Sequence, residues 1–473
     1  MQPEVFDKQS EIPASAKVVF AWHERPGAFY RLTPPWVSMK IPGKHVAIAN
    51  GQISELIIKL GPFAITWKLA YQDYIPNEQF RDVMSSGPFA YWNHLHRVES
   101  IGSTKSYMID HVEYVLPFGK LGRLFGRKWI QQFLLKMFNY RHRILTGDIA
   151  DMHKYGNFKP LRILITGSSG LIGSALKPYL TAMGHQVICL VRQDSDPQFD
   201  RILWDPENNF IDVKYLEHLD AVIHLAGENL NGRRWNKKYK SKIYNSRVKG
   251  TNLLASTLKQ LKHPPKVLIT ASAIGFYGNR HGEVVTEKSL GGVGFLANLT
   301  KDWELETEQV RARGIRLVNL RFGVVLTPAG EALAKMLLPF KMGLGGTVGR
   351  GEQSLSWVAI DDVLGAIYHG ISCKELDGPV NVVAPEPCTN QKLTKTLGAV
   401  LKRPTFFRIP KLILRILYGE VVNETLFVST SAKPVKLQNT GYEFRFPKLE
   451  PALRHILGKE IPGISSTRLN KGE

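Results

Sequence analysis

Residues 161–173 read LRILITGSSGLIG, and this stretch decides the fold of most of the chain. Its first residues form an apolar run, which is typical of a buried parallel strand. Gly167 would permit a tight turn, Gly170 would let backbone N–H groups approach a pyrophosphate, and Gly173 would let the following helix pack close to the strand. A second apolar strand follows at 186–191. A glycine triplet between a strand and a helix, with a second strand at this distance, predicts a dinucleotide-binding turn.

The end of the second strand bears on the choice of dinucleotide. A carboxylate there would bind the ribose 2′-hydroxyl of NAD, but Arg192 stands there instead and can pair with a 2′-phosphate. The sequence therefore favours NADP, while Asp194 close by leaves NAD open. The residues expected to contact the cofactor are Gly167, Ser168, Ser169, Gly170, Leu171, Ile172, Gly173, Arg192, Asp205, Leu225, Ala226 and Gly227.

Length and composition limit the class of protein. The 473 residues predict two to three domains, at roughly 150 residues for each domain. The sequence has neither an apolar run of about 18 residues nor an apolar signal core at its start, so we expect no membrane span and no secretion. Three cysteines without metal-ligand spacing fit a reducing, cytoplasmic setting.

The charge is strongly positive, with a formal net value of +21. Such a field attracts anionic partners in general. Basic residues are densest at 232–242, where a solvated helix face is the simplest interpretation and contact with an anionic ligand the alternative. No nucleic-acid-binding motif accompanies this cluster, so we expect no nucleic-acid partner.

The pattern of elements changes once along the chain. Residues 1–148 read as strands and hairpins closed by an amphipathic helix at 128–144. A polar segment at 149–160 without clear periodicity is interpreted as a linker. Residues 161–458 then alternate between apolar strands and amphipathic helices, which predicts a doubly wound parallel sheet. Residues 459–473 are expected to form a flexible tail.

Three phrases in the first region resemble the START-like (SRPBCC) helix-grip domains: IPASAKVVFAWHERPGAFYRLTPPW at 12–36, GPFAYWNHLHRVE at 87–99 and DHVEYVLPFGKLGRLF at 110–125. The resemblance implies an α+β domain, in which a curved antiparallel sheet grips a helix and often encloses an apolar ligand. Six aromatic residues either line such a cavity or fill the core: Trp36, Phe63, Trp67, Phe80, Phe89 and Trp92.

His94 and His96 put two imidazoles on one face of a strand, which is a possible start of a metal site. No third ligand is evident in the sequence, so a structural or surface role is favoured and no metal is expected. The basic helix at 128–143 suits a membrane surface, although packing against its own sheet is the favoured interpretation.

The later region resembles the short-chain dehydrogenase/reductase superfamily, in its extended, sugar-epimerase-like branch. More narrowly, it is similar to the atypical NAD-dependent epimerase family proteins, in which fusion to an N-terminal START-like domain is a known arrangement. The phrases that carry this resemblance are LAGENLNGRRW at 225–235, ASAIGFYG at 271–278, LRFGVVLTPAGEALAKMLLPFKMGLGG at 320–346 and NVVAPEPCTN at 381–390. It implies a Rossmann domain with a small C-terminal substrate region.

The resemblance also implies a catalytic Tyr placed four residues before a Lys on one helix, and the sequence departs from this pattern. The helix expected at 294–304 contains no Tyr, and Arg247 replaces the Asn that the family usually carries on an earlier helix. Ser272 remains at the position of the substrate-polarising Ser. Tyr277 and Lys301 are the other candidates for catalysis.

Glu228, Arg233 and Arg234 follow the fourth strand and are candidates to line the substrate crevice, where an Arg pair suits an anionic substrate. The leading hypothesis is an NADP-dependent oxidoreductase or epimerase acting on a small, anionic or nucleotide-sugar-like molecule, with an apolar ligand in the N-terminal domain. The alternative is a non-catalytic NADP-binding redox sensor or scaffold, which the missing Tyr/Lys pair favours. The sequence does not set the oligomeric state.

Overall fold

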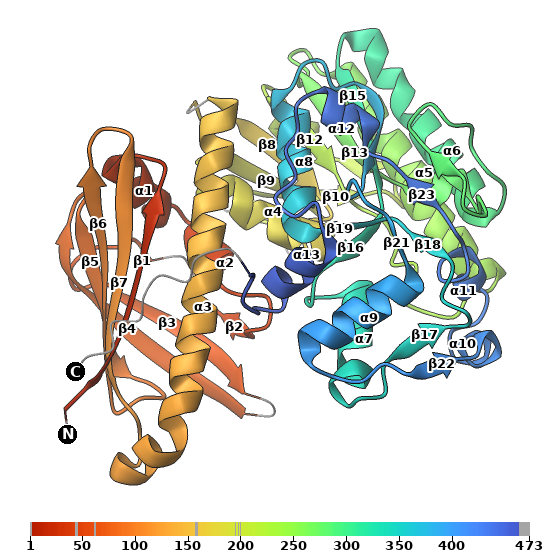
Figure 1. Cartoon of the computed structure of the whole chain (residues 1–473). Coiled ribbons are helices and arrows are strands. Elements are labelled where there is room, and N and C mark those ends of the chain that lie inside the picture. Colours follow the sequence, from red (N-terminus) through yellow and green to blue (C-terminus); the bar gives the residue numbers. More distant parts are fainter. Residues whose placement is uncertain are drawn as a thin grey trace. The chain divides into compact units, whose positions relative to one another are not determined.

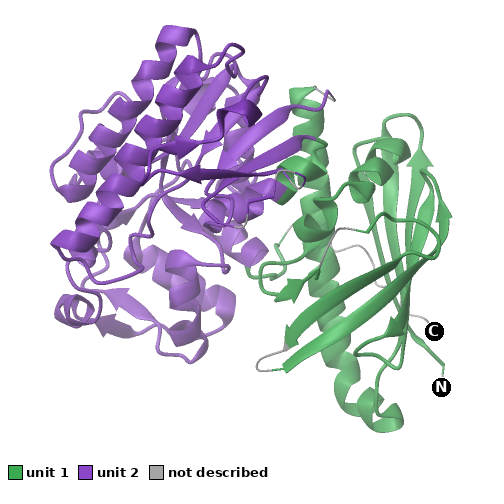
Figure 2. Cartoon of the chain, turned by 180° about the vertical axis from the view of Figure 1, so that it is seen from behind, with its two compact units in different colours: residues 1–158, 178–184, 457–473 green, residues 159–177, 185–456 purple. Residues whose placement is uncertain are grey.

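The computed structural model describes residues 2–42, 46–60, 63–156, 159–193, 195–196, 198 and 200–462. The chain forms two compact units, one of residues 1–158, 178–184 and 457–473 and the other of residues 159–177 and 185–456 (Figures 1 and 2). Asp194, which left NAD open, lies outside the described residues, as do residues 463–473 of the expected tail. Within the described ranges, no helix is both long and apolar enough to cross a membrane.

The N-terminal unit is built on a seven-stranded antiparallel sheet in the order β1-β7-β6-β5-β4-β3-β2. The strands are β1 (Glu4–Ile12), β2 (Met39–Lys40), β3 (Ile53–Leu60), β4 (Phe63–Ile75), β5 (Gln79–Ser86), β6 (Tyr91–Ile101) and β7 (Lys105–Val115), and the helices are α1 (Ala16–Glu24), α2 (Ala28–Leu32) and α3 (Gly119–Tyr155). The long helix α3 runs across one face of this sheet (Figure 1). Leu134 and Phe138 of α3 share a buried core with Phe6, Trp92 and Val112 of the strands.

Helix α3 is longer at both ends than the helix expected at 128–144. The linker drawn at 149–160 is therefore wrong over residues 149–155, which are helical. Ile149 and Met152 are buried, and the buried carboxylate of Asp148 accepts hydrogen bonds of 2.8 and 3.0 Å from Arg31. Adding residues to an existing helix costs little free energy. Burial of Ile149 and Met152 and the ion pair of Asp148 with Arg31 can therefore keep residues 149–155 helical, although their sequence is polar.

The aromatic residues of this unit mostly fill its core. Trp92 and Phe80 are buried, with 3% and 6% of their surface exposed. Trp67 packs edge-to-face against Trp92 with 5.0 Å between ring centroids, and Phe89 lies 4.9 Å from Trp92. Trp36 contacts Tyr140 of α3, whereas Phe63 is 72% exposed. The core interpretation therefore fits five of the six aromatics, and Phe63 neither fills the core nor lines a cavity.

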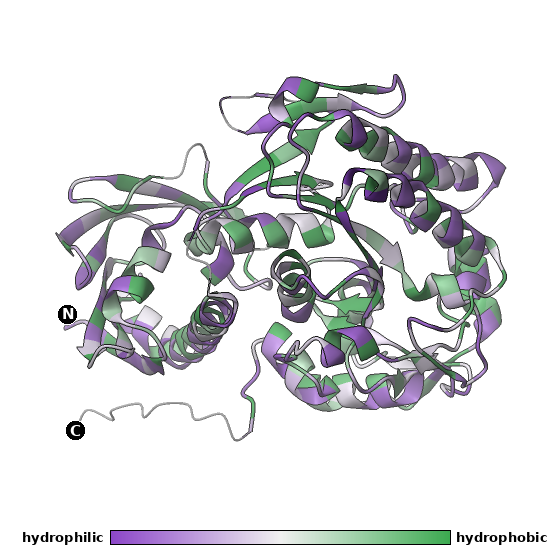
Figure 3. Cartoon of the chain, turned by 90° about the horizontal axis from the view of Figure 1, so that it is seen from above, coloured by the Kyte–Doolittle hydropathy of each residue, from purple (hydrophilic) through white to green (hydrophobic). Residues whose placement is uncertain are grey.

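The second unit contains an eight-stranded sheet in the order β11-β10-β9-β8-β12-β13-β15-β20, parallel except for the edge pair β10–β11. The strands are β8 (Arg162–Thr166), β9 (Gln186–Val191), β10 (Arg201–Asp205), β11 (Phe210–Ile211), β12 (Ala221–His224), β13 (Val267–Ala273), β15 (Arg316–Phe322) and β20 (Gly378–Val382). Ile163, Leu164 and Ile165 are fully buried, as the apolar run predicts for a strand covered on both faces. Figure 3 shows the central strands largely hydrophobic, with mixed colouring on the surrounding helices. The predicted doubly wound parallel sheet is confirmed.

The helices of this unit are α4 (Leu171–Ala182), α5 (Lys237–Gln260), α6 (Phe295–Thr307), α7 (Glu331–Lys341), α8 (Ile360–Ser372), α9 (Asn390–Leu401), α10 (Lys411–Tyr418), α11 (Val421–Glu424), α12 (Val435–Asn439) and α13 (Leu449–Ile456). Short 3₁₀ helices lie at Val213–Tyr215, Ile274–Tyr277 and Glu308–Arg313. Among the described residues of this unit, four two-stranded sheets lie outside the main sheet: β14 (Val284–Val285) with β23 (Ser431–Ala432), β16 (Val324–Leu326) with β19 (Trp357–Ala359), β17 (Gly346–Val348) with β22 (Phe407–Ile409), and β18 (Ser354–Leu355) with β21 (Cys388–Thr389). Three of these pairs, β16–β19, β17–β22 and β18–β21, lie after β15 in the chain with α7 and α9–α11, in the C-terminal part that the sequence assigned to substrate.

Candidate functional site

The glycine-rich turn lies where the strand order of the parallel sheet reverses. β8 and β12 are neighbours, and from them the strands proceed outward on opposite sides, through β9 and β10 on one side and β13 and β15 on the other. Connections that leave in opposite directions open a crevice at the carboxyl ends of such strands, where open α/β sheets bind ligands. Thr166 ends β8 and pairs in register with His224, which ends β12. Residues 167–173 and 225–227 therefore lie at this crevice.

Backbone packing leaves no space for side chains at two of the three glycines. Gly167 has a φ of +70°, and a Cβ there would lie 2.8 Å from the backbone of Leu225 and Ala226. A Cβ at Gly173 would lie 2.2 Å from the carbonyl oxygen of Gly167. At Gly170 the nearest atom within the chain would be 3.2 Å away, and this residue is exposed. Gly167 and Gly173 thus serve the close packing of the turn, while Gly170 leaves a bare backbone facing solvent.

The turn leads directly into helix α4. Ser168 and Ser169 lie in the turn, and Leu171 and Ile172 form the first turn of the helix. The first N–H groups of a helix have no partners within it and carry partial positive charge. A pyrophosphate beside Gly170 would face these N–H groups, so the local geometry suits a dinucleotide.

A buried chain of hydrogen bonds joins the two loops of the crevice. His224 Nδ1 lies 2.7 Å from Thr166 Oγ1, and its Nε2 lies 2.9 Å from Thr251 Oγ1 on α5. Thr166 Oγ1 accepts from the N–H groups of Leu225 and Ala226, both at 3.2 Å. Burial, with a smaller contribution from nearby Arg247, lowers the pKa of His224 to about 4, so this imidazole is neutral at physiological pH.

Arg192 and Asp205 lie near each other, at the ends of the neighbouring strands β9 and β10. Arg192 is exposed, and its positive charge helps to lower the pKa of Asp205. The larger cause of that lower pKa is a hydrogen bond from the side-chain amide of Asn208, at 2.7 Å. Asp205 also accepts from the N–H group of Glu207 at 3.0 Å, so its carboxylate stabilises a local turn.

Arg247 supports the loop that follows β12. Its guanidinium donates a 2.9 Å hydrogen bond to the carbonyl of Glu228 and lies over the ring of Trp303 at 5.2 Å. Desolvation by burial lowers the pKa of Arg247 to about 10, which leaves it charged at neutral pH. Arg247 therefore places a half-buried cation directly beneath residues 227 and 228.

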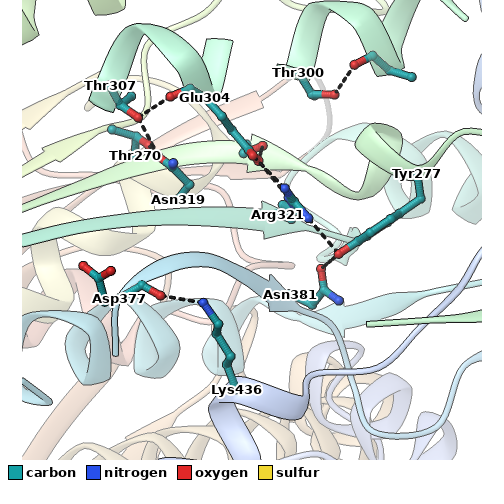
Figure 4. Close-up of polar contacts among 12 residues, drawn as sticks. Thr270, Tyr277, Thr300, Glu304, Thr307, Asn319, Arg321, Asp377, Asn381 and Lys436 are labelled. Atoms are coloured by element: carbon teal, nitrogen blue, oxygen red, sulfur yellow. Dashed lines mark hydrogen bonds and ion pairs between the residues drawn. The ribbon is translucent and has the colours of Figure 1, made fainter. Parts of the chain in front are cut away.

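Ser272 belongs to a buried polar row at the carboxyl edge of the sheet, and Figure 4 shows Glu304, Arg321, Tyr277 and Asn381 of this row. Ser272, Arg321 and Asn381 are register partners on the neighbouring strands β13, β15 and β20. Glu304 on α6 accepts from Ser272 Oγ at 2.6 Å and from two Arg321 nitrogens at 2.8 and 2.7 Å. The charges of Glu304 and Arg321 neutralise each other, which allows both groups to be buried.

Tyr277 extends this row, and the prediction that its hydroxyl serves the substrate does not fit its placement. The side chain is fully buried. Its hydroxyl donates to Asn381 at 2.7 Å and accepts from Arg321 at 3.0 Å (Figure 4). Burial raises the pKa of this hydroxyl, which opposes its ionisation. Tyr277 is therefore placed as a positioning residue for Arg321.

The other predicted site residues lie apart from one another, outside the buried polar row. Lys301 on α6 donates from Nζ to the carbonyl of Gly292 at 2.8 Å and is exposed. Glu228 pairs with Lys242 at 3.1 Å. Arg233 is exposed, whereas Arg234 donates to the carbonyl of Ile416 at the end of α10, at 3.1 Å. The two arginines are thus used differently, and Arg234 ties its loop to the C-terminal region.

Three polar residues of this site escaped the sequence interpretation: Glu304, Arg321 and Asn381. Arg247 was noticed only as a departure from the family's Asn. A signal existed for Arg321, because a charged residue inside the apolar strand 316–322 requires a buried partner. Glu304 was inside the expected helix, but the sequence alone does not pair it with a strand.

Comparisons with known proteins place this geometry in a family. The profile of the NAD dependent epimerase/dehydratase family matches residues 163–382, and that of a domain of unknown function, DUF1731, matches residues 409–456. An epimerase family protein of Mycobacterium bovis is 38% identical over 291 residues, which is 62% of this chain and 96% of that protein. The human epimerase family protein SDR39U1 is 34% identical over 300 residues, 63% of this chain and its whole length.

Two solved structures are similar as well. The nucleoside-diphosphate sugar epimerase of Corynebacterium glutamicum matches with a TM-score of 0.79 and 30% identity, over 96% of this chain and 90% of its own. That match includes the N-terminal unit. Human SDR39U1 (isoform 2), solved with NADPH, matches with a TM-score of 0.59 and 34% identity, over 63% of this chain and 99% of its own. The chain therefore belongs to the NAD-dependent epimerase/dehydratase family.

Proposed function

We propose that the chain binds NADPH at the glycine-rich turn and uses it as an oxidoreductase or epimerase on a small molecule. The observation that carries this proposal is the turn itself, since Gly167 and Gly173 have no space for a Cβ while Gly170 offers bare backbone at the start of α4. The cofactor supplies hydride chemistry at its nicotinamide ring. The human relative solved with NADPH supports this assignment.

The preference for NADP over NAD rests on Arg192. This exposed guanidinium at the end of β9 is free of the local turn that engages Asp205, and it can form paired hydrogen bonds with a 2′-phosphate. The predicted cofactor set, residues 167–173, Arg192, Asp205 and residues 225–227, remains part of the proposal. Asp205 is kept in this set because it lies close to Arg192.

We propose Ser272 and Lys301 as the catalytic groups. Ser272 Oγ has a carboxylate partner in Glu304, which can hold the hydroxyl in one orientation at the edge of the crevice. Lys301 is exposed one helical turn before Glu304, and its amine can release Gly292 to approach a ligand. Tyr277 acts in this scheme only through Arg321.

The proposed substrate is small and anionic, with a nucleotide sugar as the model compound. Exposed Arg233 and the Glu228 carboxylate follow β12 directly, and the similar Corynebacterium protein is described as a nucleoside-diphosphate sugar epimerase. A non-catalytic NADP-binding sensor is the second candidate function, and the absence of the Tyr/Lys pair in the sequence favours it.

For the N-terminal part we retain the proposal of a START-like domain at 1–148, followed by the epimerase-like domain at 161–458, in a cytoplasmic protein. A seven-stranded antiparallel sheet against one long helix supports that likeness. The proposal of an apolar ligand has less support than the proposal of a START-like fold, because most of the aromatic residues expected to line a cavity pack against one another or against α3.

Cofactor titration tests the central proposal. Purified protein is titrated with NADPH and with NADH while nicotinamide fluorescence is followed. Tight NADPH binding with much weaker NADH binding is the expected result, and absence of binding by either refutes it. A screen with nucleotide sugars then separates an enzyme from a sensor: a reductase oxidises NADPH in the presence of its substrate, and an epimerase converts a sugar to its epimer with no net change in the cofactor.

A further inference from the structure

Three strands of the N-terminal unit bring histidine and carboxylate side chains together on one face of the sheet. Asp82 of β5 is the register partner of His94 of β6, and His96 of β6 is the register partner of Asp110 of β7. His94 also contacts Phe138 of α3, so this face is the one that the long helix covers. Asp82, His94, His96 and Asp110 thus form a cluster between sheet and helix.

The geometry of three of these residues matches a metal-ligand set. One donor atom from each of Asp82, His94 and His96 can be chosen so that all lie within 4.8 Å of one another. His94 Nδ1 is 3.1 Å from Asp82 Oδ1, and His96 Nε2 is 3.9 Å from Asp82 Oδ2. Ligands bound at about 2.1 Å are separated by roughly 3 to 4 Å in tetrahedral and octahedral sites, so both distances fit.

The contact between Asp82 and His94 is not aligned as a hydrogen bond. Among the described residues, Asp82 Oδ1 has no hydrogen-bond partner, although it is buried. Other buried polar atoms of this unit also lack a hydrogen-bond partner among the described residues, and two of them, His96 Nδ1 and His142 Nδ1, belong to the same group of side chains. An unseen ion or water is a usual explanation for such atoms.

The remaining residues of the cluster occupy the positions expected of supporting groups. His94 Nε2 lies 2.9 Å from Asp110 Oδ1, and His96 Nδ1 lies 3.0 Å from the same oxygen. The other oxygen of Asp110 lies 2.6 Å from Nε2 of His142 on α3. At His94, Asp110 accepts a hydrogen bond from one ring nitrogen and leaves the opposite nitrogen free to bind a metal, as in carboxylate–histidine–metal triads. At His96 the contact with Asp110 is not aligned as a hydrogen bond, because Nδ1 is buried without a hydrogen-bond partner among the described residues.

We propose that His94 Nδ1, His96 Nε2 and the Asp82 carboxylate bind a divalent first-row transition ion. Two imidazoles and one carboxylate are the donor set used for Zn²⁺ and Fe²⁺ in sites that keep open positions. A small cavity lined by His96, Asp110, Arg141 and His142 adjoins the cluster on the side of Asp110. The carboxylates of Asp82 and Asp110 would together balance the ion's two positive charges, and the cations of Arg141 and Lys8 interact with Asp110.

The test is metal binding by the full-length chain without a histidine tag. After dialysis against EDTA, the protein is titrated with Co²⁺, followed by visible absorption, and with Zn²⁺, followed by calorimetry. We expect saturation at one equivalent in each case. Binding that never saturates, or that saturates well below one equivalent, overturns the proposal.

Two variants and one matched control locate the site. Asp82→Asn and His96→Gln should each weaken Co²⁺ binding at least about tenfold. His111→Gln should bind as the wild type does, because His111 lies on β7 beside Asp110, is paired with Asp7 at 2.6 Å, and is partly exposed instead of buried in the cluster. Equal affinity in all three variants overturns the proposal.

Circular dichroism of the metal-free proteins establishes that the variants fold. If Asp82→Asn and His96→Gln both unfold, X-ray absorption of the Zn²⁺-loaded wild type decides the question. Scattering from two imidazoles supports the site, and a coordination shell without imidazole refutes it.

Discussion

Gly173→Ala tests the close packing of the cofactor turn. The new Cβ would lie 2.2 Å from the carbonyl oxygen of Gly167, about 1.2 Å short of the 3.4 Å at which ordinary contact begins. It would also lie 2.7 Å from Ser168 Cα, so only backbone surrounds it and no flexible side chain can yield. Helix α4 must therefore move away from the turn. Overpacking of this kind costs about 1 to 3 kcal/mol, which corresponds to a melting temperature lower by roughly 2 to 10 °C.

Calorimetry and an NADPH titration measure the two consequences separately. A shift of the turn by about 1 Å should weaken NADPH binding by about ten- to a hundredfold, because the N–H groups no longer converge on the pyrophosphate. Gly170→Ala is the matched control within the same turn: its Cβ would meet only the Gly167 carbonyl at 3.2 Å. We expect it to keep a nearly wild-type melting temperature and to lose NADPH affinity. Wild-type stability and affinity in Gly173→Ala would refute the packing argument, and wild-type affinity in Gly170→Ala would refute the position of the pyrophosphate.

Three further predictions concern single side chains. Arg192→Ala should weaken NADPH binding at least about tenfold and leave NADH binding unchanged, since it removes a partner of the 2′-phosphate alone; equal losses for both cofactors would contradict this. His224 has a folded pKa of about 4 against a usual 6.5, so its contribution to stability is complete above pH 6.5 and declines as pH falls toward 4, by about 3 kcal/mol in total. Urea unfolding at pH 7.5 and 4.5 should show this decline reduced in His224→Gln, and an equal decline in both proteins would count against it. Glu304→Gln removes the charge that balances the buried Arg321 and should cost about 3 to 5 kcal/mol in the free energy of unfolding; a loss below about 1 kcal/mol in urea titrations would show that the pair is not stabilising.

The sequence predicts those parts of the fold that depend on local pattern. The run 161–173 combines a buried strand, a turn and a helix start within a few residues, so its physical requirements are visible without knowledge of distant contacts. The ends of α3 could not be predicted in this way. They depend on burial of Ile149 and Met152 and on the pairing of Asp148 with Arg31, which is distant in sequence.

The same reason explains which polar residues escaped prediction. His94 and His96 are visible as a pair because they share a strand, whereas Asp82 joins them only through the register of β5 against β6. Glu304 meets Ser272 and Arg321 because α6 packs beside β13 and β15. Partners of this kind are brought together only by the tertiary structure, and contacts between distant segments cannot be read from a single sequence.

The buried row also bears on how a reaction could proceed without the Tyr/Lys pair. Ser272 donates to a carboxylate that is already neutralised by Arg321, so Glu304 fixes the serine and does not present a free base. Tyr277 is occupied by Asn381 and Arg321. A proton donor or acceptor for a substrate must then come from the exposed rim, where Lys301 lies one turn from Glu304. Lys301→Met should consequently abolish substrate-dependent NADPH oxidation while NADPH binding and stability remain unchanged. If this variant retains turnover, Lys301 is not the proton donor or acceptor, and a group of the substrate or a water molecule must take that role.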